Sequence, residues 1–226
     1  MNVKLVSYSQ PTEEFRHSGI EDAQDLIAFC ARVSNPSNQF NTETSEKLIR
    51  YLVRNKHWSP LEMVSACLEI TTTRDIARQI LRHRSFSFQE FSQRYADPTK
   101  DLSFVLREAR LQDTTNRQNS IKLGASVAET LLKDEWILYQ NEVIQAARNA
   151  YTWAINRGIA KEQARAVLPE GLMESRLYMN GTIRSWVHFI ELRSANGTQL
   201  EHQQVARACA EVISKVFSLA SEFTTN

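Results

Sequence analysis

The sequence contains little glycine, little cysteine and no long apolar run, and each shortage excludes a class of protein. Its 226 residues include six glycines, which form neither GxGxxG nor GxxxxGK[ST]. A bound dinucleotide would therefore lie on side chains and helix ends rather than on a Rossmann turn or a P-loop. The three cysteines, Cys30, Cys67 and Cys209, form no CxxC pair, so neither a metal site nor a disulfide framework is expected. No apolar stretch approaches the roughly 18 residues that span a bilayer.

Neither sign of charge dominates the composition. The chain has 27 Lys and Arg against 26 Asp and Glu, a net charge of +1. Such a balance provides no overall attraction to nucleic acid or to a membrane surface, so we expect neither as a partner. The first residues lack the charged and apolar regions of a signal peptide, and we expect a cytoplasmic protein.

The hydrophobic periodicity predicts one helix-rich α/β domain over residues 1–226. The length favours a single large core over two small ones, and no repeat or linker interrupts the chain. Apolar spacing, caps and stops predict helices over 21–33, from Thr42 or Thr44 to about 56, and over 75–84, 126–156, 161–168, 182–194 and 200–223. Strands are predicted over 3–6, 61–73, 104–106 and 177–179, with a loop over the segment after 84.

The segment after residue 81 concentrates cations, amides, hydroxyls and aromatic rings. Arg82-His83-Arg84 is followed after seven residues by Ser92 and then by Arg94. Arginine forks bind phosphate oxygens bidentately, serine and glutamine add directional hydrogen bonds, and aromatic rings cover a flat base. The mixture favours an anionic, planar ligand such as a nucleotide. Because His83 is flanked by two arginines, we expect its ring to be neutral.

A stripe of arginines leads into that segment and supports a second hypothesis. Arg74, Arg78 and Arg82 recur every four residues and would share one face of the predicted helix. That face is either solvated or a phosphate-binding surface, as in a helical nucleic-acid-binding module. Such a module would bind DNA or RNA with a strong dependence on salt. We expect Phe86 and its aromatic neighbours to anchor the following loop in the core.

A second group of polar residues lies on the predicted helix over 182–194. On a helical wheel Arg184 and His188 share a polar stripe, whereas Arg193 falls beside Trp186 and Phe189. An arginine among large apolar side chains is seldom unpaired, so it should meet a carboxylate or an anionic ligand. An interfacial salt bridge and a ligand site are both compatible with this pattern.

Four segments, in the expected order, resemble the flavin-dependent thymidylate synthases. They are His57-x-Ser59-Pro60-x-Glu62, Arg82-His83-Arg84-x7-Ser92-x-Arg94-Tyr95, Arg165-x-Val167-Leu168-Pro169 and Arg184-Ser185-x-x-His188-Phe189-x-x-Leu192-Arg193. The resemblance implies a small mixed or antiparallel sheet packed by long helices. It also implies reductive methylation of dUMP to dTMP, with 5,10-methylenetetrahydrofolate as carbon donor and NADPH-reduced FAD as hydride carrier. Members of the family are homotetramers with shared active sites.

The same resemblance implies a role for individual residues. The residues expected to bind FAD are Ser59, Arg82, His83, Arg84, Glu90, Thr182, Arg184 and His188. Those expected to bind dUMP are Gln79, Arg82, Glu90, Ser92, Arg94, Arg165 and Arg193. Arg193 would be the catalytic residue, placed at the uracil ring to favour its ionised form. We expect Ser92 to bind phosphate, since the motif offers no base to make it a nucleophile. A third hypothesis keeps flavin and nucleotide binding without turnover.

Overall fold

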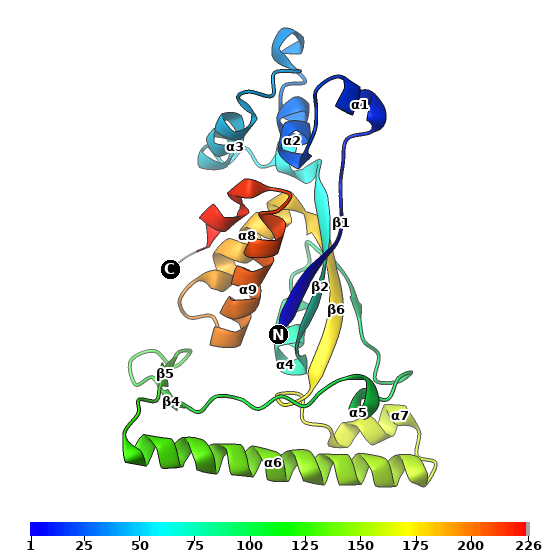
Figure 1. The fold of residues 1–226 in the computed structure, drawn as a ribbon, viewed down its shortest axis with the longest axis vertical. Coiled ribbons are helices and arrows are strands. Elements are labelled where there is room, and N and C mark those ends of the chain that lie inside the picture. Colours follow the sequence, from blue (N-terminus) through cyan, green and yellow to red (C-terminus); the bar gives the residue numbers. More distant parts are fainter. Residues whose placement is uncertain (225–226) are drawn as a thin grey trace.

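A narrow antiparallel sheet runs along the long axis of the molecule in the computed structural model, which describes residues 1–224 (Figure 1). The strand order is β1-β2-β6-β3, and every neighbouring pair is antiparallel. A separate two-stranded hairpin, β4–β5, lies near one end of the longest helix. The strands are β1 (Asn2–Tyr8), β2 (Ser65–Thr73), β3 (Ser87–Glu90), β4 (Arg110–Gln112), β5 (Ser120–Lys122) and β6 (Glu174–Thr182).

Helices gather at both ends of the sheet and along one of its faces (Figure 1). The α-helices are α1 (Glu13–His17), α2 (Ala23–Ala31), α3 (Ser45–Arg54), α4 (Arg74–Ile80), α5 (Pro98–Asp101), α6 (Val127–Asn156), α7 (Lys161–Ala164), α8 (Ile183–Ser194) and α9 (Leu200–Ile213). Four 3₁₀ turns are η1 (Pro36–Asn38), η2 (Ser59–Glu62), η3 (Arg165–Val167) and η4 (Ser218–Phe223).

The main core lies between the sheet and the pair α8 and α9. Alternate residues of β2 and β6 are buried, as expected of a sheet with one covered face. Leu68 of β2 pairs with Met179 of β6, and both are fully buried. The Trp186 indole of α8 donates a hydrogen bond to the Ala66 carbonyl at 3.0 Å, which satisfies the one polar atom of a large buried ring.

An aromatic anchor holds the turn between α4 and β3 against this core. The Phe86 ring packs edge-on against Trp186, with centroids 4.8 Å apart. A Cβ on Gly181 of β6 would lie 2.4 Å from the Phe86 ring, closer than real contacts allow. Glycine at 181 therefore leaves the space that this ring occupies. The expectation that Phe86 anchors the loop is confirmed.

The predicted helix over 75–84 is too long at its end. Helix α4 ends at Ile80, and residues 81–85 turn toward β3. Arg82 consequently lies in a turn and not on the helix face of Arg74 and Arg78. The loop predicted after residue 84 is also wrong in part, because Ser87–Glu90 pairs with β6 as an edge strand.

Five further predictions differ from the structure in extent. Residues 59–62 form the 3₁₀ turn η2, with Pro60 in its first positions, so the strand predicted over 61–73 starts only at Ser65. Residues 104–106 contribute one isolated bridge, Phe104 to Met173, and not a strand. The strand predicted over 177–179 is the middle of nine-residue β6. The predicted helices over 161–168 and 200–223 end early, as α7 and α9, and 3₁₀ turns follow.

Helix α6 forms the base of the molecule and is mostly exposed (Figure 1). The prediction of a helix over 126–156 is confirmed, and Ser126 caps it in a capping box with Glu129. Its 30 residues span about 45 Å at 1.5 Å per residue. Within residues 1–224, no helix combines the length and the apolar character needed to cross a bilayer.

Candidate active site

The last turn of α8 and the turn after α4 meet through an arginine–histidine hydrogen bond. Arg193 donates its Nε–H to Nε2 of His83 at 2.8 Å. The His83 ring stands edge-on to Phe189, with centroids 5.0 Å apart. Burial, and then the charge of Arg193, lowers the pKa of His83 to about 4. The ring is therefore neutral as expected, but the charge responsible is Arg193 and not the flanking arginines.

Arg193 has no carboxylate partner among the described residues. Burial and the charge of Arg82 both lower its pKa below the usual arginine value. The sequence pattern left a carboxylate or an anionic ligand as the partner of Arg193. The structure excludes a carboxylate of residues 1–224 as this partner. A half-buried guanidinium beside a second cation favours a negatively charged ligand.

Helix α9 and its N-cap residue contribute polar side chains that sequence reasoning missed. The Gln79 amide of α4 donates to Oε1 of Gln199 at 2.8 Å, and its own Oε1 lies 3.2 Å from Nδ1 of His202. Burial, then Arg193 and His83, lowers the pKa of His202 to about 3. No motif marks Gln199 or His202. A lone histidine on an apolar helix face carries no signal that distinguishes a functional role from a core position.

The stripe of α8 predicted to bind FAD faces the turn η2. Arg184 forms an ion pair with Glu62, and His188 stands edge-on to Trp58, with ring centroids 4.5 Å apart. Ser59 begins the same turn and is exposed. The structure thus brings Ser59, Arg184 and His188 to one region.

The N-terminus of α8 is fastened to the turn that carries Arg84. Thr182 caps the helix, because its side chain accepts from the Ser185 amide at 3.3 Å. The Ser185 hydroxyl donates to the Ser85 carbonyl at 3.2 Å. Arg82 and Arg84 are both exposed, and neither pairs with a carboxylate within residues 1–224. Their guanidinium groups are therefore available to a ligand.

A cavity of about 260 Å³ lies on the other side of α4. Its charged lining consists of Arg74, Arg78, Arg165 and Glu170. Arg165 donates to the Glu162 carbonyl at 3.3 Å and reaches no carboxylate of residues 1–224. Arg74 and Arg78, by contrast, belong to an ion-pair network.

Glu90 is the centre of that network. Its carboxylate lies 3.4 Å from Arg74 and 3.5 Å from Arg78, and the Ser175 hydroxyl donates to it at 2.7 Å. Glu170 approaches the same two arginines at 3.3 and 3.5 Å. Arg74 is also buried. Two arginines of the stripe, Arg74 and Arg78, are therefore already neutralised by carboxylates, which counts against the nucleic-acid-binding hypothesis.

The predicted dUMP residues do not line one cavity in this chain. Gln79 and Arg193 belong to the region where α4, α8 and α9 meet, whereas Arg165 lines the cavity beside Glu170. Ser92 begins the turn that follows β3, and Arg94 lies 3.8 Å from Glu162. The chain thus presents two separate parts of the predicted substrate site.

Cysteine and metal chemistry contribute nothing visible to this arrangement. The three cysteines are unpaired, and burial raises the pKa of the Cys209 thiol. Within residues 1–224, no three His, Cys, Asp or Glu side chains cluster in a way that suits a metal ion.

Comparison with known proteins identifies the chain's relatives. Residues 16–218 match the family described as "Thymidylate synthase complementing protein". A probable flavin-dependent thymidylate synthase of Paramecium bursaria Chlorella virus 1 is 45% identical over 220 residues, covering 96% of this chain and 95% of that protein. A flavin-dependent thymidylate synthase of Synechocystis sp. is 43% identical over 217 residues, covering 96% of each.

A solved structure supports the same relationship. The UMP/dUMP methylase PolB from Streptomyces cacaoi, bound with 5-Br dUMP, superposes with a TM-score of 0.78 at 25% identity. The match covers 98% of this chain and 93% of that one. The sequence motifs, the fold and the similarity to named relatives, 43–45% identical over 96% of this chain, agree that the chain belongs to the flavin-dependent thymidylate synthase family.

Proposed function

We propose that the chain carries out its family's reaction with the residues gathered around Arg193. The reaction is the reductive methylation of dUMP to dTMP, with 5,10-methylenetetrahydrofolate as carbon donor and NADPH as reductant of FAD. The observation that carries the assignment of residues is Arg193 itself, a half-buried cation that is hydrogen-bonded to a neutral histidine and has no carboxylate partner in the described part of the chain.

The residues available for FAD fit its chemistry. Arg82 and Arg84 offer unpaired donors to phosphate oxygens, and His188 with Trp58 offers aromatic surface beside exposed Ser59. When bound, FAD supplies the hydride that the protein side chains cannot supply. We propose that Arg184, Thr182 and Glu90 belong to the same binding set, with Thr182 acting through the start of α8.

Arg193 would act on the uracil ring of dUMP. His83 accepts from Nε of Arg193, so both terminal nitrogens of the guanidinium are left for the ligand. A fixed cation in a half-buried site stabilises negative charge on the ring more than the same cation in water. Arg193 would therefore favour the ionised pyrimidine, and the neutral His83 would hold its orientation.

Arg165 would meet the other end of the nucleotide. It lines a cavity next to the turn of Ser92, with Arg94 nearby. Serine and arginine donors of this kind suit a phosphate monoester. Gln79 and Arg82, near Arg193, would contact the base and sugar.

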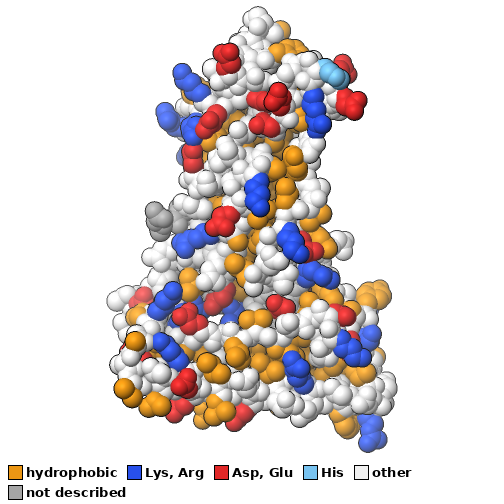
Figure 2. Space-filling view, viewed as in Figure 1, with side chains coloured by type: hydrophobic (Ala, Val, Ile, Leu, Met, Phe, Trp, Pro, Cys, Tyr) orange, Lys and Arg blue, Asp and Glu red, His pale blue; other side chains and the backbone are white. Residues whose placement is uncertain are grey.

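A homotetramer with shared active sites would join the separated parts of the substrate site. Helix α6 exposes Val127, Leu131, Leu138, Tyr139 and Trp153, each by more than half of its surface. Hydrophobic side chains gather over this base in the space-filling view (Figure 2). An exposed apolar face of this extent is typical of a subunit interface. Sedimentation velocity at micromolar concentration tests the oligomer, and a monomer would refute it. A single domain over residues 1–226 and a cytoplasmic location complete the proposal.

An absorbance spectrum of the purified protein tests the proposed function. We expect flavin bands that bleach on addition of NADPH, faster with dUMP present, followed by dTMP formation when methylenetetrahydrofolate is added. Flavin reduction without methyl transfer would favour the third hypothesis, in which the protein binds flavin and nucleotide but forms no dTMP. A protein that stays colourless after incubation with FAD would refute the proposal.

A further inference from the structure

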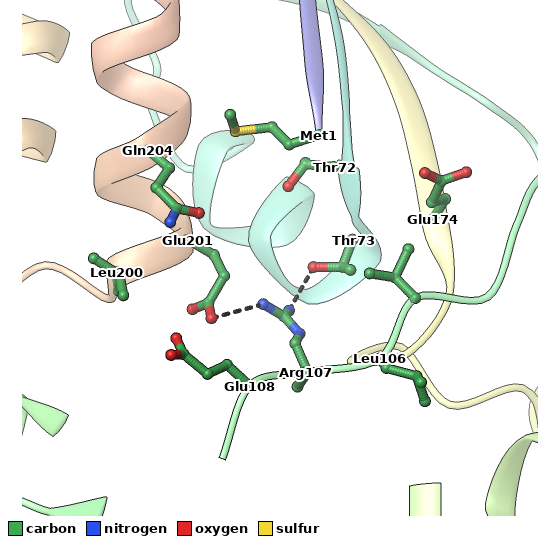
Figure 3. Close-up of a pocket in the computed structure, with 11 residues that line it drawn as sticks. Met1, Thr72, Thr73, Leu106, Arg107, Glu108, Glu174, Leu200, Glu201 and Gln204 are labelled. Carbon is green, nitrogen blue, oxygen red and sulfur yellow. Dashed lines mark hydrogen bonds and ion pairs between the residues drawn. The ribbon is translucent and has the colours of Figure 1, made fainter. Parts of the chain in front are cut away.

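A chain of hydrogen bonds links the partly buried acidic residue Glu201 to the proposed nucleotide contact Gln79. Oε1 of Glu201 forms ion pairs with two arginines: Arg107 at 3.4 Å and Arg110 in closer contact. Figure 3 shows Arg107 between Glu201 and Thr73. The other oxygen, Oε2, accepts from Nε2 of Gln199 at 3.0 Å.

The Glu201 carboxylate determines which group donates and which accepts in each hydrogen bond of this series. Burial disfavours the ionised form of Glu201. Its own backbone N–H, Gln199 and the charges of Arg110 and Arg107 nevertheless hold the pKa of this carboxyl below its usual value. An ionised carboxylate only accepts hydrogen bonds, so Gln199 must direct its NH₂ toward Glu201 and its carbonyl oxygen toward Gln79.

The direction then passes to the next two side chains. Because Gln199 presents its oxygen, the Gln79 NH₂ donates to it at 2.8 Å and the Gln79 carbonyl faces His202. Nδ1 of His202, 3.2 Å from that carbonyl, must therefore carry the ring proton. Nε2 of His202 is buried and has no partner among the described residues.

We propose that Glu201 is a positioning residue for the nucleotide site. It acts through Gln199 to fix the amide of Gln79, so that one Gln79 N–H is left for a carbonyl or hydroxyl oxygen of the bound nucleotide. It also holds His202 as the Nδ1–H tautomer behind Phe189. The proposal rests on the proposed function, in which Gln79 contacts dUMP.

The first test compares two carboxylates that contact the same arginine. Glu201→Gln keeps the shape of the side chain but can donate to Gln199, so the chain can run in either direction. Asp75→Asn removes the other carboxylate partner of Arg107, which lies at 2.6 Å, and leaves Gln199 untouched. With FAD-loaded enzyme, calorimetry should show E201Q binding dUMP about tenfold more weakly, as for one lost hydrogen bond. D75N should stay within about twofold of wild type on the same scale. Equal losses in both variants would reduce Glu201 to a structural ion pair.

Further variants separate positioning from folding. Gln199→Leu leaves every ion pair of Glu201 in place and should weaken dUMP binding as much as E201Q. In the double variant the two losses should not add, since both break one chain. His202→Asn keeps a donor at the place of Nδ1 and should bind dUMP better than His202→Leu. Wild-type affinity in Q199L would overturn the proposal.

Nitrogen-15 NMR of labelled histidine measures the His202 tautomer, and therefore the direction of the hydrogen bonds, without any nucleotide. We expect the Nδ1–H tautomer for His202 in the wild type and in D75N, and a mixture of tautomers in E201Q. A wild-type Nε2–H tautomer would overturn the direction of the chain. An enzyme that binds no dUMP would instead refute the proposed function, and the tautomer would still report the chain's direction.

Discussion

Two groups of arginines lie around α4, and they differ in what neutralises them. Arg74, Arg78 and Arg107 reach carboxylates, and the side chains of Arg74 and Arg107 are largely buried. Arg82 and Arg193 reach no carboxylate of residues 1–224. The first group holds segments of the chain together, whereas the second leaves its positive charge for a ligand. Pairing, rather than the number of arginines in a stretch, separates a structural cluster from a binding site.

The largest effect should come from breaking the paired group. Arg74→Met would leave the carboxylate of Glu90, whose side chain is 14% exposed, without its more buried cationic partner. Removing one member of a buried ion pair costs about 3 kcal/mol or more in the free energy of unfolding. Urea unfolding measures it, and the double variant R74M/E90Q should recover part of the loss. A loss in R74M as small as that of an exposed pair would contradict the structural role.

Removing an unpaired arginine should harm activity and spare the fold. Arg193→Ala is expected to lower the rate of dTMP formation by on the order of 100-fold or more, the usual loss when a fixed electrostatic group is deleted. The flavin bands and the melting temperature should stay close to those of wild type, because no ion pair is broken. Arg193→Lys keeps the charge without the planar fork and should fall between the two. If R193A retained its rate, the role at the uracil ring would be wrong.

The neutral histidines predict how stability changes with pH. His202 has a pKa of about 3 in the folded protein against 6.5 ordinarily, so between these values the unfolded chain binds a proton that the folded one does not. Stability should therefore rise with pH across that window and level off above it. His202→Asn should flatten the slope below about pH 6.5 and leave a pH-independent difference above it. Equal slopes in the two proteins would show that His202 is protonated in the fold.

The smallest effect tests an arginine of intermediate character. Arg184 pairs with Glu62, but both side chains are about 40% exposed. Exposed pairs contribute about 0–1 kcal/mol, so Glu62→Gln should change the free energy of unfolding by less than about 1 kcal/mol. Thermal unfolding of E62Q beside R74M provides the comparison. A loss similar to that of R74M would place Arg184 in the structural group.

Local sequence rules predicted what local forces decide. The family, the small sheet packed by helices and the reaction, which the resemblance implied, are confirmed, and α6 begins one residue after the predicted start of its helix. The end of α4 and the strand β3 were mispredicted because pairing with β6 overrides the local pattern. The roles of the individual site residues stay predictions.

Whether an arginine is paired depends on residues that are distant in the sequence, so the sequence pattern could not predict it. Arg74 and Arg193 are equally basic in the sequence, yet Glu170 reaches one and His83 the other. Gln199 and His202 were missed because their importance comes from facing Gln79 across 120 or more residues. No spacing rule within α9 records that contact.

Gly181 and Phe86 constrain each other's size, and this constraint extends to the turn that carries Arg82, His83 and Arg84. The missing Cβ is the space that the Phe86 ring fills, and that ring anchors the turn carrying Arg82, His83 and Arg84. The two positions should therefore covary among related sequences. A larger residue at 181 is tolerated only where residue 86 is smaller than phenylalanine. A strand position that touches no ligand thus belongs to the evolutionary constraint on the binding turn.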